Sequence, residues 1–315
     1  MNTRAAPHWA SLPETTWVLG IRLLVAVHAL LGRWPFRFCV FPVVFCHWLF
    51  NATARRASMQ YLARVQAHGG ALGGRPGRRH GLKHFLVFAE TLLDKMLALA
   101  GRYPTGKVML NRQVMLEQIA NGRGGIIVTA HMGCLELCRA LAPQVPGLRL
   151  VVLVHTAHAE TFNRMLRQLA PNDPVELVQV TELDPGIAMR LAERMAEGAF
   201  ITIAGDRVPV QGHRHTMASF LGRPAPFPIG PYVLAAMLGC PLFAMGCTHR
   251  GDSYAIDFVK LAEKVELPRA SRDAALAACA ADFAAWLESQ VHAAPYDWFN
   301  FFPFWEQIPH DAPRP

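Results

Sequence analysis

The sequence predicts an α/β protein with a mostly parallel central sheet flanked by helices, preceded by an apolar helical segment that anchors the chain to a membrane. The first observation is an alternation of short apolar runs with helical stretches, the rhythm of a parallel sheet covered by helices. The second is length, since 315 residues can bury one large core of this kind. Expected strands are 126–130, 148–154, 175–180, 200–204, 242–247 and 254–259; expected helices are 83–101, 111–120, 133–141, 158–169, 185–197, 229–238 and 271–292.

The third observation is an unusually apolar and basic composition. Hydrophobic residues make up 52% of the chain and charged residues only 17%, where about a quarter is usual. The net charge is +8 and the mean hydropathy is +0.19. These values favour contact with an anionic membrane leaflet or an acidic carrier protein. Nucleic acid is the competing partner, but no nucleic-acid-binding motif is recognisable, so we expect none.

Residues 17–50 form the most apolar block. Arg22 and His28 interrupt its first half and Pro42 its second, so neither half is a clean run of about 20 apolar residues. We expect a bent helix or shallow helical hairpin lying in the cytoplasmic leaflet, with a true span as the alternative. Arg33 and Arg37 are expected to snorkel or meet lipid phosphates.

The chain divides into three predicted parts. Residues 1–67 form the membrane-associated helical segment, residues 68–80 a flexible Gly/Arg-rich connector, and residues 81–315 the catalytic domain. No A-x-A-like site follows the apolar block, so no cleaved signal is expected. The seven cysteines lie mostly in apolar runs without a CxxC pair, which fits reduced thiols in a cytosolic compartment.

The segment GGIIVTAHMGCLE, residues 124–136, carries the strongest chemical signal. His131 follows a predicted strand and Glu136 begins the next helix, at the sheet edge where open α/β sheets place ligands. A His in the turn and a Glu in the first helical turn can converge, so that the carboxylate holds the imidazole's tautomer while the free nitrogen takes a proton. The competing interpretation is a core histidine, since a His/Glu pair at this spacing also arises by chance.

The H-x-G-x-x-E core, its glycine-rich entry and the downstream segments GDR (205–207) and FLGRPAPFPIGP (220–231) together resemble the lysophospholipid acyltransferase superfamily, in its lipid A biosynthesis branch. The resemblance covers about residues 80–306. It implies a glycerolipid acyltransferase-like fold that moves an acyl chain from acyl carrier protein or coenzyme A to a lipid-like hydroxyl, at the cytoplasmic face of a bacterial inner membrane. The GDR variant and aromatic tail resemble the enzymes of aryl-polyene or xanthomonadin-type pigment pathways.

On this interpretation His131 is the general base and Glu136 orients it. Oxyanion donors are expected from backbone N–H groups around Gly133 or from a guanidinium. Because a thioester is already activated, no metal or other cofactor is expected. The predicted substrate-binding residues are Gly133, Asn163, Arg164, Asp206 and Arg207, of which Asp206 should share the edge of His131 if the strands are parallel. A strand-end salt bridge is the alternative for Asp206 and Arg207, and a solvated helix face for Arg164.

Rival functions remain open at this point. A glycerophosphate or lysophospholipid acyltransferase would need an arginine motif for phosphate, and a non-catalytic inner-membrane lipid-binding protein would not need the dyad. Cys134 is a conceivable nucleophile, but packing is the favoured interpretation. His213 and His215 lack partners at metal-ligand spacing. The aromatic tail, residues 296–305, either closes a core edge or lines an acyl channel.

Overall fold

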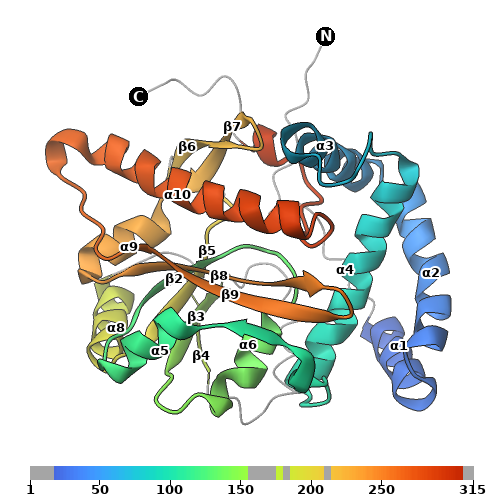
Figure 1. Cartoon of the computed structure of the whole chain (residues 1–315), viewed down its shortest axis with the longest axis horizontal. Helices are drawn as coiled ribbons and strands as arrows, with labels where there is room; N and C mark the ends of the chain where they lie inside the picture. The colour runs from blue at the N-terminus through green and yellow to red at the C-terminus, as the bar shows by residue number, and fades with distance from the viewer. Residues whose placement is uncertain (1–17, 155–174, 180–184, 209–213, 308–315) are drawn as a thin grey trace.

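A seven-stranded sheet lies at the centre of the molecule, with helices on both of its faces (Figure 1). The computed structural model describes residues 18–154, 175–179, 185–208 and 214–307. The strand order is β1-β9-β8-β2-β5-β3-β4, and only the β8/β9 pair is antiparallel. The strands are β1 (Met109–Asn111), β2 (Gly125–Thr129), β3 (Leu150–Val154), β4 (Glu176–Gln179), β5 (Phe200–Ala204), β8 (Leu242–Arg250) and β9 (Ser253–Ala262), with β6 (His215–Phe220) and β7 (Arg223–Pro228) in a separate hairpin.

The helices surround this sheet on several sides. They are α1 (Val18–Leu31), α2 (Arg33–Phe50), α3 (Ala52–Gly69), α4 (Arg78–Leu99), α5 (Gln113–Ala120), α6 (Glu136–Leu141), α8 (Pro185–Ala196), α9 (Gly230–Leu238) and α10 (Arg272–Ala293). Single 3₁₀ turns are η2 (Thr105–Lys107), η3 (Ala142–Gln144), η4 (Arg269–Ser271) and η5 (Phe304–Glu306). In Figure 1, α10 lies on one side of the sheet and α5 and α6 on the other.

The mostly parallel sheet confirms the predicted fold class, and all six predicted strands are present. Two features were not predicted. β1 has three exposed residues at the sheet edge and therefore shows no alternation. The β6–β7 hairpin contains the proline-rich strand RPAPFP, which reads as a loop because proline cannot donate a ladder hydrogen bond. The predicted helix 158–169 lies outside the described residues.

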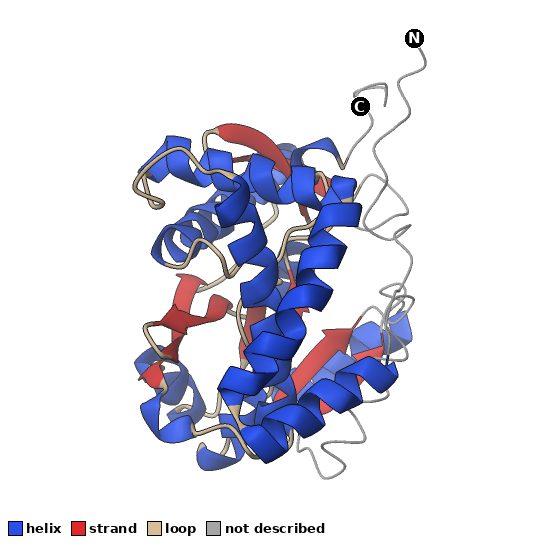
Figure 2. Ribbon diagram, turned by 90° about the vertical axis from the view of Figure 1, so that its right-hand side faces the viewer, coloured by secondary structure: helices blue, strands red, loops and turns tan. Residues whose placement is uncertain are grey.

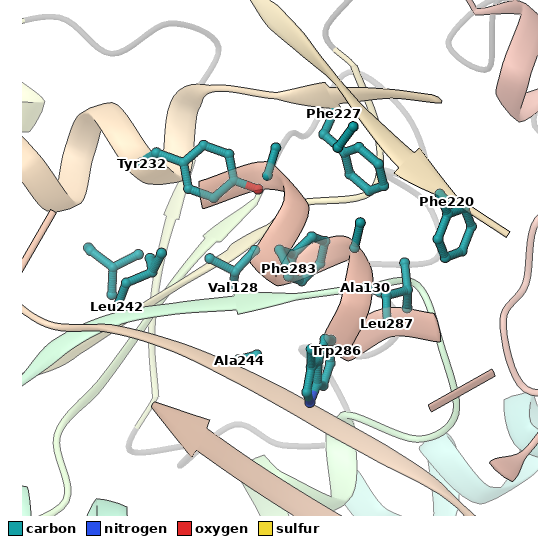
Figure 3. Packing of buried hydrophobic residues seen from close by; sticks show 14 of the residues in the cluster. Val128, Ala130, Phe220, Phe227, Tyr232, Leu242, Ala244, Phe283, Trp286 and Leu287 are labelled. Carbon is teal, nitrogen blue, oxygen red and sulfur yellow. The ribbon is translucent and has the colours of Figure 1, made fainter. Parts of the chain in front are cut away.

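β2 is buried on both faces, which explains its continuous apolar run. Val128 and Ala130 pack toward α9, α10 and the hairpin, in the cluster drawn in Figure 3. Ile127 packs in a second cluster with Phe200, Phe243 and Phe258 on the other face. The strand that leads to His131 is thus held from both sides, which fixes where the strand ends.

The N-terminal helices pack against the rest of the described protein. One stripe of α2, made of Phe36, Val40, Val44 and Trp48, is buried in a cluster that includes Cys134 and residues of α4 and β9. α3 supplies Tyr61, Leu62 and Val65 to the main core. The predicted connector is also shorter than 68–80, because α4 already begins at Arg78. Figure 2 views this helical side of the molecule face on.

Two arginines of α2 face α4 and pair with its carboxylates. Arg37 makes hydrogen bonds of 3.0 and 2.7 Å to the two oxygens of Glu90, and Arg33 pairs with Asp94. A bidentate guanidinium–carboxylate pair fixes geometry as well as charge. The expectation that Arg33 and Arg37 meet lipid phosphates is therefore corrected, since both side chains clamp α2 onto α4.

The opposite stripe of α2 is apolar and exposed. Of the large apolar side chains that are exposed among the described residues, ten lie between Leu23 and Phe50 and seven in the rest of the chain. Trp34 is 79% exposed and Phe38 83%. No single described helix is long and apolar enough to cross a membrane, although α2 and α3, bent by 93° at their junction, meet that criterion as a pair.

His84 on α4 is fully buried and predicts a loss of stability in acid. Its ring lies 2.8 Å from Ser58 Oγ and 2.9 Å from the carbonyl oxygen of Trp298, and burial lowers its pKa to about 4. Between about pH 6.5 and pH 4, His84 is protonated in the unfolded chain but neutral in the folded chain. The free energy of unfolding therefore falls as the pH drops through this range. We expect this residue to account for roughly 3 kcal/mol of that loss. Urea unfolding of wild type and His84→Gln across this range measures it, and equal pH slopes would contradict the expectation.

Candidate active site

His131 stands where β2 ends, at the edge of the sheet that β5 also reaches. The two strands pair in parallel from Gly125↔Phe200 to Thr129↔Ala204, so the residues after Thr129 and after Ala204 emerge side by side. A hydrogen bond of 2.8 Å from the N–H of Gly205 to the carbonyl of Thr129 continues this pairing. The predicted meeting of His131 and Asp206 at one edge is confirmed by this register.

The Asp206 carboxylate accepts three N–H groups. Oδ1 lies 2.7 Å from Nδ1 of His131, while Oδ2 accepts the backbone N–H of His131 at 2.8 Å and the indole N–H of Trp298 at 2.9 Å. Asp206 is 2% exposed. Burial acts to raise its pKa, but the imidazole and the hydrogen bonds from His131 outweigh burial and bring that pKa to about 2. The carboxylate is therefore ionised at every pH at which a histidine can act as a base.

This pairing fixes the tautomer of His131. With Nδ1–H donating to the carboxylate, the ring presents the lone pair of Nε2. The His131 side chain is 40% exposed, and no hydrogen bond to Nε2 is found among the described residues. The packing around the ring and the positive charge of Arg207 lower the pKa of His131 below its ordinary value, against the pull of Asp206. The imidazole is consequently neutral, and able to accept a proton, at neutral pH.

Glu136 does not take the position expected for it beside the imidazole. Its carboxylate pairs with Lys95 of α4, with Nζ 3.2 Å from Oε2 and 3.3 Å from Oε1. Burial acts to lower the pKa of Lys95, but the charge and hydrogen bond of Glu136, together with the nearby thiols Cys134 and Cys247, outweigh it, and the net shift is upward. The expected contact of Glu136 with His131 is corrected, because Asp206 reaches Nδ1 from the neighbouring strand. A catalytic role for Glu136 stays a prediction.

The backbone N–H groups of the turn after β2 are already engaged. Those of His131 and Met132 donate to Asp206 and to the carbonyl of Ala130, while those of Gly133 and Cys134 donate to the carbonyls of Asp297 and Cys247. The N–H groups of residues 131–134 are therefore less available as the expected oxyanion donors. Gly133 has a φ of +50°, and a Cβ there would lie 1.7 Å from the carbonyl oxygen of Cys247, so only glycine fits.

Arg207 is the guanidinium closest in sequence to this carboxylate. Its central carbon lies 5.6 Å from the ring centroid of Phe302, and its charge lowers the pKa values of both His131 and Asp206. Burial lowers the pKa of Arg207 itself, against the charge of Asp206. Because a guanidinium keeps its proton in proteins, Arg207 supplies fixed positive charge beside the imidazole.

The remaining predicted residues have different outcomes. Asn163, Arg164 and His213 lie outside the described residues, and His215 begins β6. Cys134 is fully buried, and burial together with the charge of Glu136 raises its thiol pKa well above the usual range, so the packing interpretation is confirmed. The aromatic tail closes the core, since Trp298, Phe299, Phe302 and Phe304 are buried.

Sequence reasoning missed Lys95, which lies inside an ordinary amphipathic helix, and Trp298, which lies in the aromatic tail. It also missed a second histidine–carboxylate pair, in which Asp297 accepts both the backbone N–H of His249 at 2.5 Å and its Nδ1 at 2.8 Å. The only available signal was an aspartate among aromatics at 297–299. The partner of that aspartate is set by the contact between the tail and the end of β8, which no local pattern encodes.

Comparison with known families identifies one match. Residues 107–307 match the family model of the bacterial lipid A biosynthesis acyltransferases. This span is about two thirds of the chain and contains His131, Glu136 and Asp206. No curated protein matches the chain significantly.

The Lys95–Glu136 pair predicts that a single neutralisation is worse than a double one. Glu136→Gln leaves a partly buried ammonium unpaired and should cost about 1 to 3 kcal/mol of unfolding free energy, whereas Lys95→Met with Glu136→Gln should recover most of it. Chemical denaturation measures both. If Glu136 only neutralises Lys95, the double variant should recover acyl-transfer activity together with stability. A stable but inactive double variant would show that the Glu136 carboxylate is needed for catalysis itself.

Proposed function

We propose that this chain, which belongs to the bacterial lipid A biosynthesis acyltransferase family, moves a fatty acyl chain from a thioester to a hydroxyl of a lipid-like acceptor. Members of this family are acyltransferases, and the chain is one of them. The observation that carries the proposal is the hydrogen bond of 2.7 Å between Asp206 and Nδ1 of His131, which leaves the basic Nε2 directed away from its anchor.

In the proposed reaction, Nε2 of His131 takes the proton of the acceptor hydroxyl as its oxygen attacks the thioester carbonyl. The tetrahedral intermediate then collapses, the C–S bond breaks, and the leaving thiolate recovers the proton from the imidazolium. Asp206 stabilises that imidazolium without being protonated, because its own pKa is about 2. General-base help of this kind contributes about 10² to 10⁴ in rate.

Arg207 is the proposed donor to the oxyanion. The tetrahedral intermediate carries a negative charge close to the attacking oxygen, and a fixed guanidinium nearby stabilises that charge. Support comes from its place in the sequence directly after Asp206 and from its effect on the pKa of His131. The turn around Gly133 is a poorer candidate because its N–H groups are already engaged.

The acyl chain requires an apolar slot, and a cavity lies between the sheet and the helices α5 and α6. Ile127 of β2, Cys138 and Leu141 of α6, and Phe258 of β9 line it, with Arg112 as its charged residue. β2 leads into His131 and α6 follows it, so the cavity shares these two elements with the proposed site. We propose that the acyl group occupies it.

The exposed stripe of α1 and α2 is the proposed membrane-binding face. An apolar face of this length has no protein partner among the described residues and is costly to leave in water. Together with the basic net charge, it fits interfacial binding to an anionic leaflet. The corresponding location is the cytoplasmic face of a bacterial inner membrane, where the acyl thioester is also available.

The proposed donor is acyl carrier protein, with acyl-coenzyme A as the alternative. A carrier protein is acidic, and Arg75, Arg78 and Arg79 are exposed at the start of α4, where they can steer its approach. The acceptor is proposed to be a lipid, a glycolipid or a pigment lipid of the aryl-polyene type. Mass spectrometry of lipids and pigments from a deletion strain identifies it directly, because the missing acyl ester names the acceptor.

The mechanism predicts losses of activity of different size when either member of the His131–Asp206 dyad is substituted. His131→Ala should lower kcat about 10² to 10⁴-fold. Asp206→Asn should lower kcat and move the acid limb of kcat/KM to lower pH, since the lost carboxylate had been raising the pKa of His131. Initial rates with acyl carrier protein and coenzyme A thioesters measure both, with circular dichroism as a fold control. Near wild-type turnover by folded His131→Ala would sink the base assignment.

The membrane proposal predicts a loss of vesicle binding without a loss of chemistry. Replacing both Trp34 and Phe38 by Glu removes two apolar anchors and should weaken binding to anionic phospholipid vesicles at least about 100-fold. Met189→Glu with Met237→Glu is the matched control, because these exposed residues lie on α8 and α9. Cosedimentation measures binding, and detergent assays should show unchanged kcat. Equal binding by both double variants would place the anchor elsewhere.

A further inference from the structure

We infer that Trp298 is a positioning residue of the catalytic dyad, which sets the base strength of His131 through the Asp206 carboxylate. The inference rests on the proposed role of His131 as general base, and it assigns a function to a residue of the C-terminal aromatic tail. The starting point is the hydrogen bond of 2.9 Å from the indole Nε1–H of Trp298 to Oδ2 of Asp206.

Because of that hydrogen bond, the negative charge of the Asp206 carboxylate is shared between the imidazole of His131 and the indole of Trp298. Oδ1 faces the imidazole, and Oδ2 is shared by the indole and the backbone N–H of His131. A donor on a carboxylate stabilises its negative charge and so weakens its pull on a neighbouring proton. Removing only the indole N–H should therefore strengthen the attraction of Asp206 for the imidazolium and raise the pKa of His131.

Trp298 is held rigidly enough to act in this way. Its ring, 1% exposed, makes edge contacts with Tyr61 of α3, Phe220 of β6 and Phe304 of η5, with centroids 4.9 to 5.3 Å apart. Its carbonyl oxygen accepts from Nε2 of His84. An indole fixed from three elements cannot follow the carboxylate if it moves, so it constrains the orientation of Asp206.

The backbone on each side of Trp298 is tied to the same turn. Phe299 donates its N–H to the carbonyl of His131 at 2.9 Å, and Gly133 donates its N–H to the carbonyl of Asp297 at 2.9 Å. The Asp297 carboxylate in turn accepts two hydrogen bonds from His249, one from its backbone N–H and one from Nδ1. Hydrogen bonds on both sides of Trp298 therefore fix the position of its indole relative to the turn that carries His131.

Two replacements isolate the indole N–H. Trp298→Phe keeps an aromatic ring, and benzothienylalanine at position 298 keeps the full bicyclic shape with sulfur in place of N–H. We expect the acid limb of kcat/KM to move up by roughly half to one pH unit in both. The kcat on the plateau should fall about 10-fold, less than in His131→Ala, with KM for the acyl donor unchanged.

Trp286→Phe is the matched control. Trp286 is also a buried indole of the core, but its Nε1 has no hydrogen-bond partner among the described residues, so its pH profile should match wild type. ¹⁵N NMR titration of His131 gives the same pKa shift without any assay of activity.

Each other outcome overturns a defined part of the account. An unmoved acid limb and an unmoved His131 titration in the benzothienyl variant, with His131→Ala inactive, reject the positioning role alone. The same result with His131→Ala active rejects the base assignment itself. An equal shift in Trp286→Phe, or failure of both Trp298 variants to fold, assigns Trp298 a structural role only and contradicts the inference.

Discussion

The buried carboxylate of Asp206 is the constraint on which the site depends. It lies at the end of β5, and its three N–H donors come from His131 at the end of β2 and from Trp298 near the C-terminus. A buried anion without such donors would be neutralised by protonation, and the imidazole would lose its fixed tautomer. The parallel pairing of β2 with β5 and the docking of the aromatic tail are therefore needed for the histidine to be a directed base.

The rest of the fold can be understood as support for this arrangement. β2 is packed on both faces, so its end cannot shift, and Gly133 lets the chain pass within contact distance of Cys247 on β8. α4 connects the N-terminal helices to the site, since Asp94 pairs with Arg33 of α2 and Lys95 with Glu136 of α6. The exposed apolar stripe of α2, which we propose binds lipid, and the imidazole of His131, which we propose as the base, are thereby parts of one packed body.

Sequence reasoning reached the fold and part of the site because both have local signatures. The strand Phe200–Ala204 and the position of His131 follow from apolar runs and from glycine spacing, and the parallel order placed Asp206 at the correct edge. The choice between Glu136 and Asp206 was not decidable in this way. It depends on Lys95, which forms an ion pair with Glu136. Lys95 lies 41 residues earlier in the chain, so no local sequence pattern predicts this pairing.

The N-terminal helices illustrate the same limit. Their apolar composition predicts membrane contact, but composition does not distinguish the stripe of α2 that packs on α4 from the stripe that is left exposed. Arg33 and Arg37 read as lipid-facing charges until the carboxylates of Asp94 and Glu90 are seen opposite them. Periodicity supplies the two stripes, and only the tertiary partner decides which one is buried.

The protonation state of His131 is the most direct test of the central claim that Asp206 directs this base. ¹⁵N NMR of histidine-labelled protein, assigned by comparison with His131→Gln, reports which ring nitrogen carries the proton. The account predicts a proton on Nδ1, a bare Nε2 at neutral pH, and a titration midpoint below the ordinary value of 6.5. A proton on Nε2, or a spectrum that Asp206→Asn leaves unchanged, would contradict it.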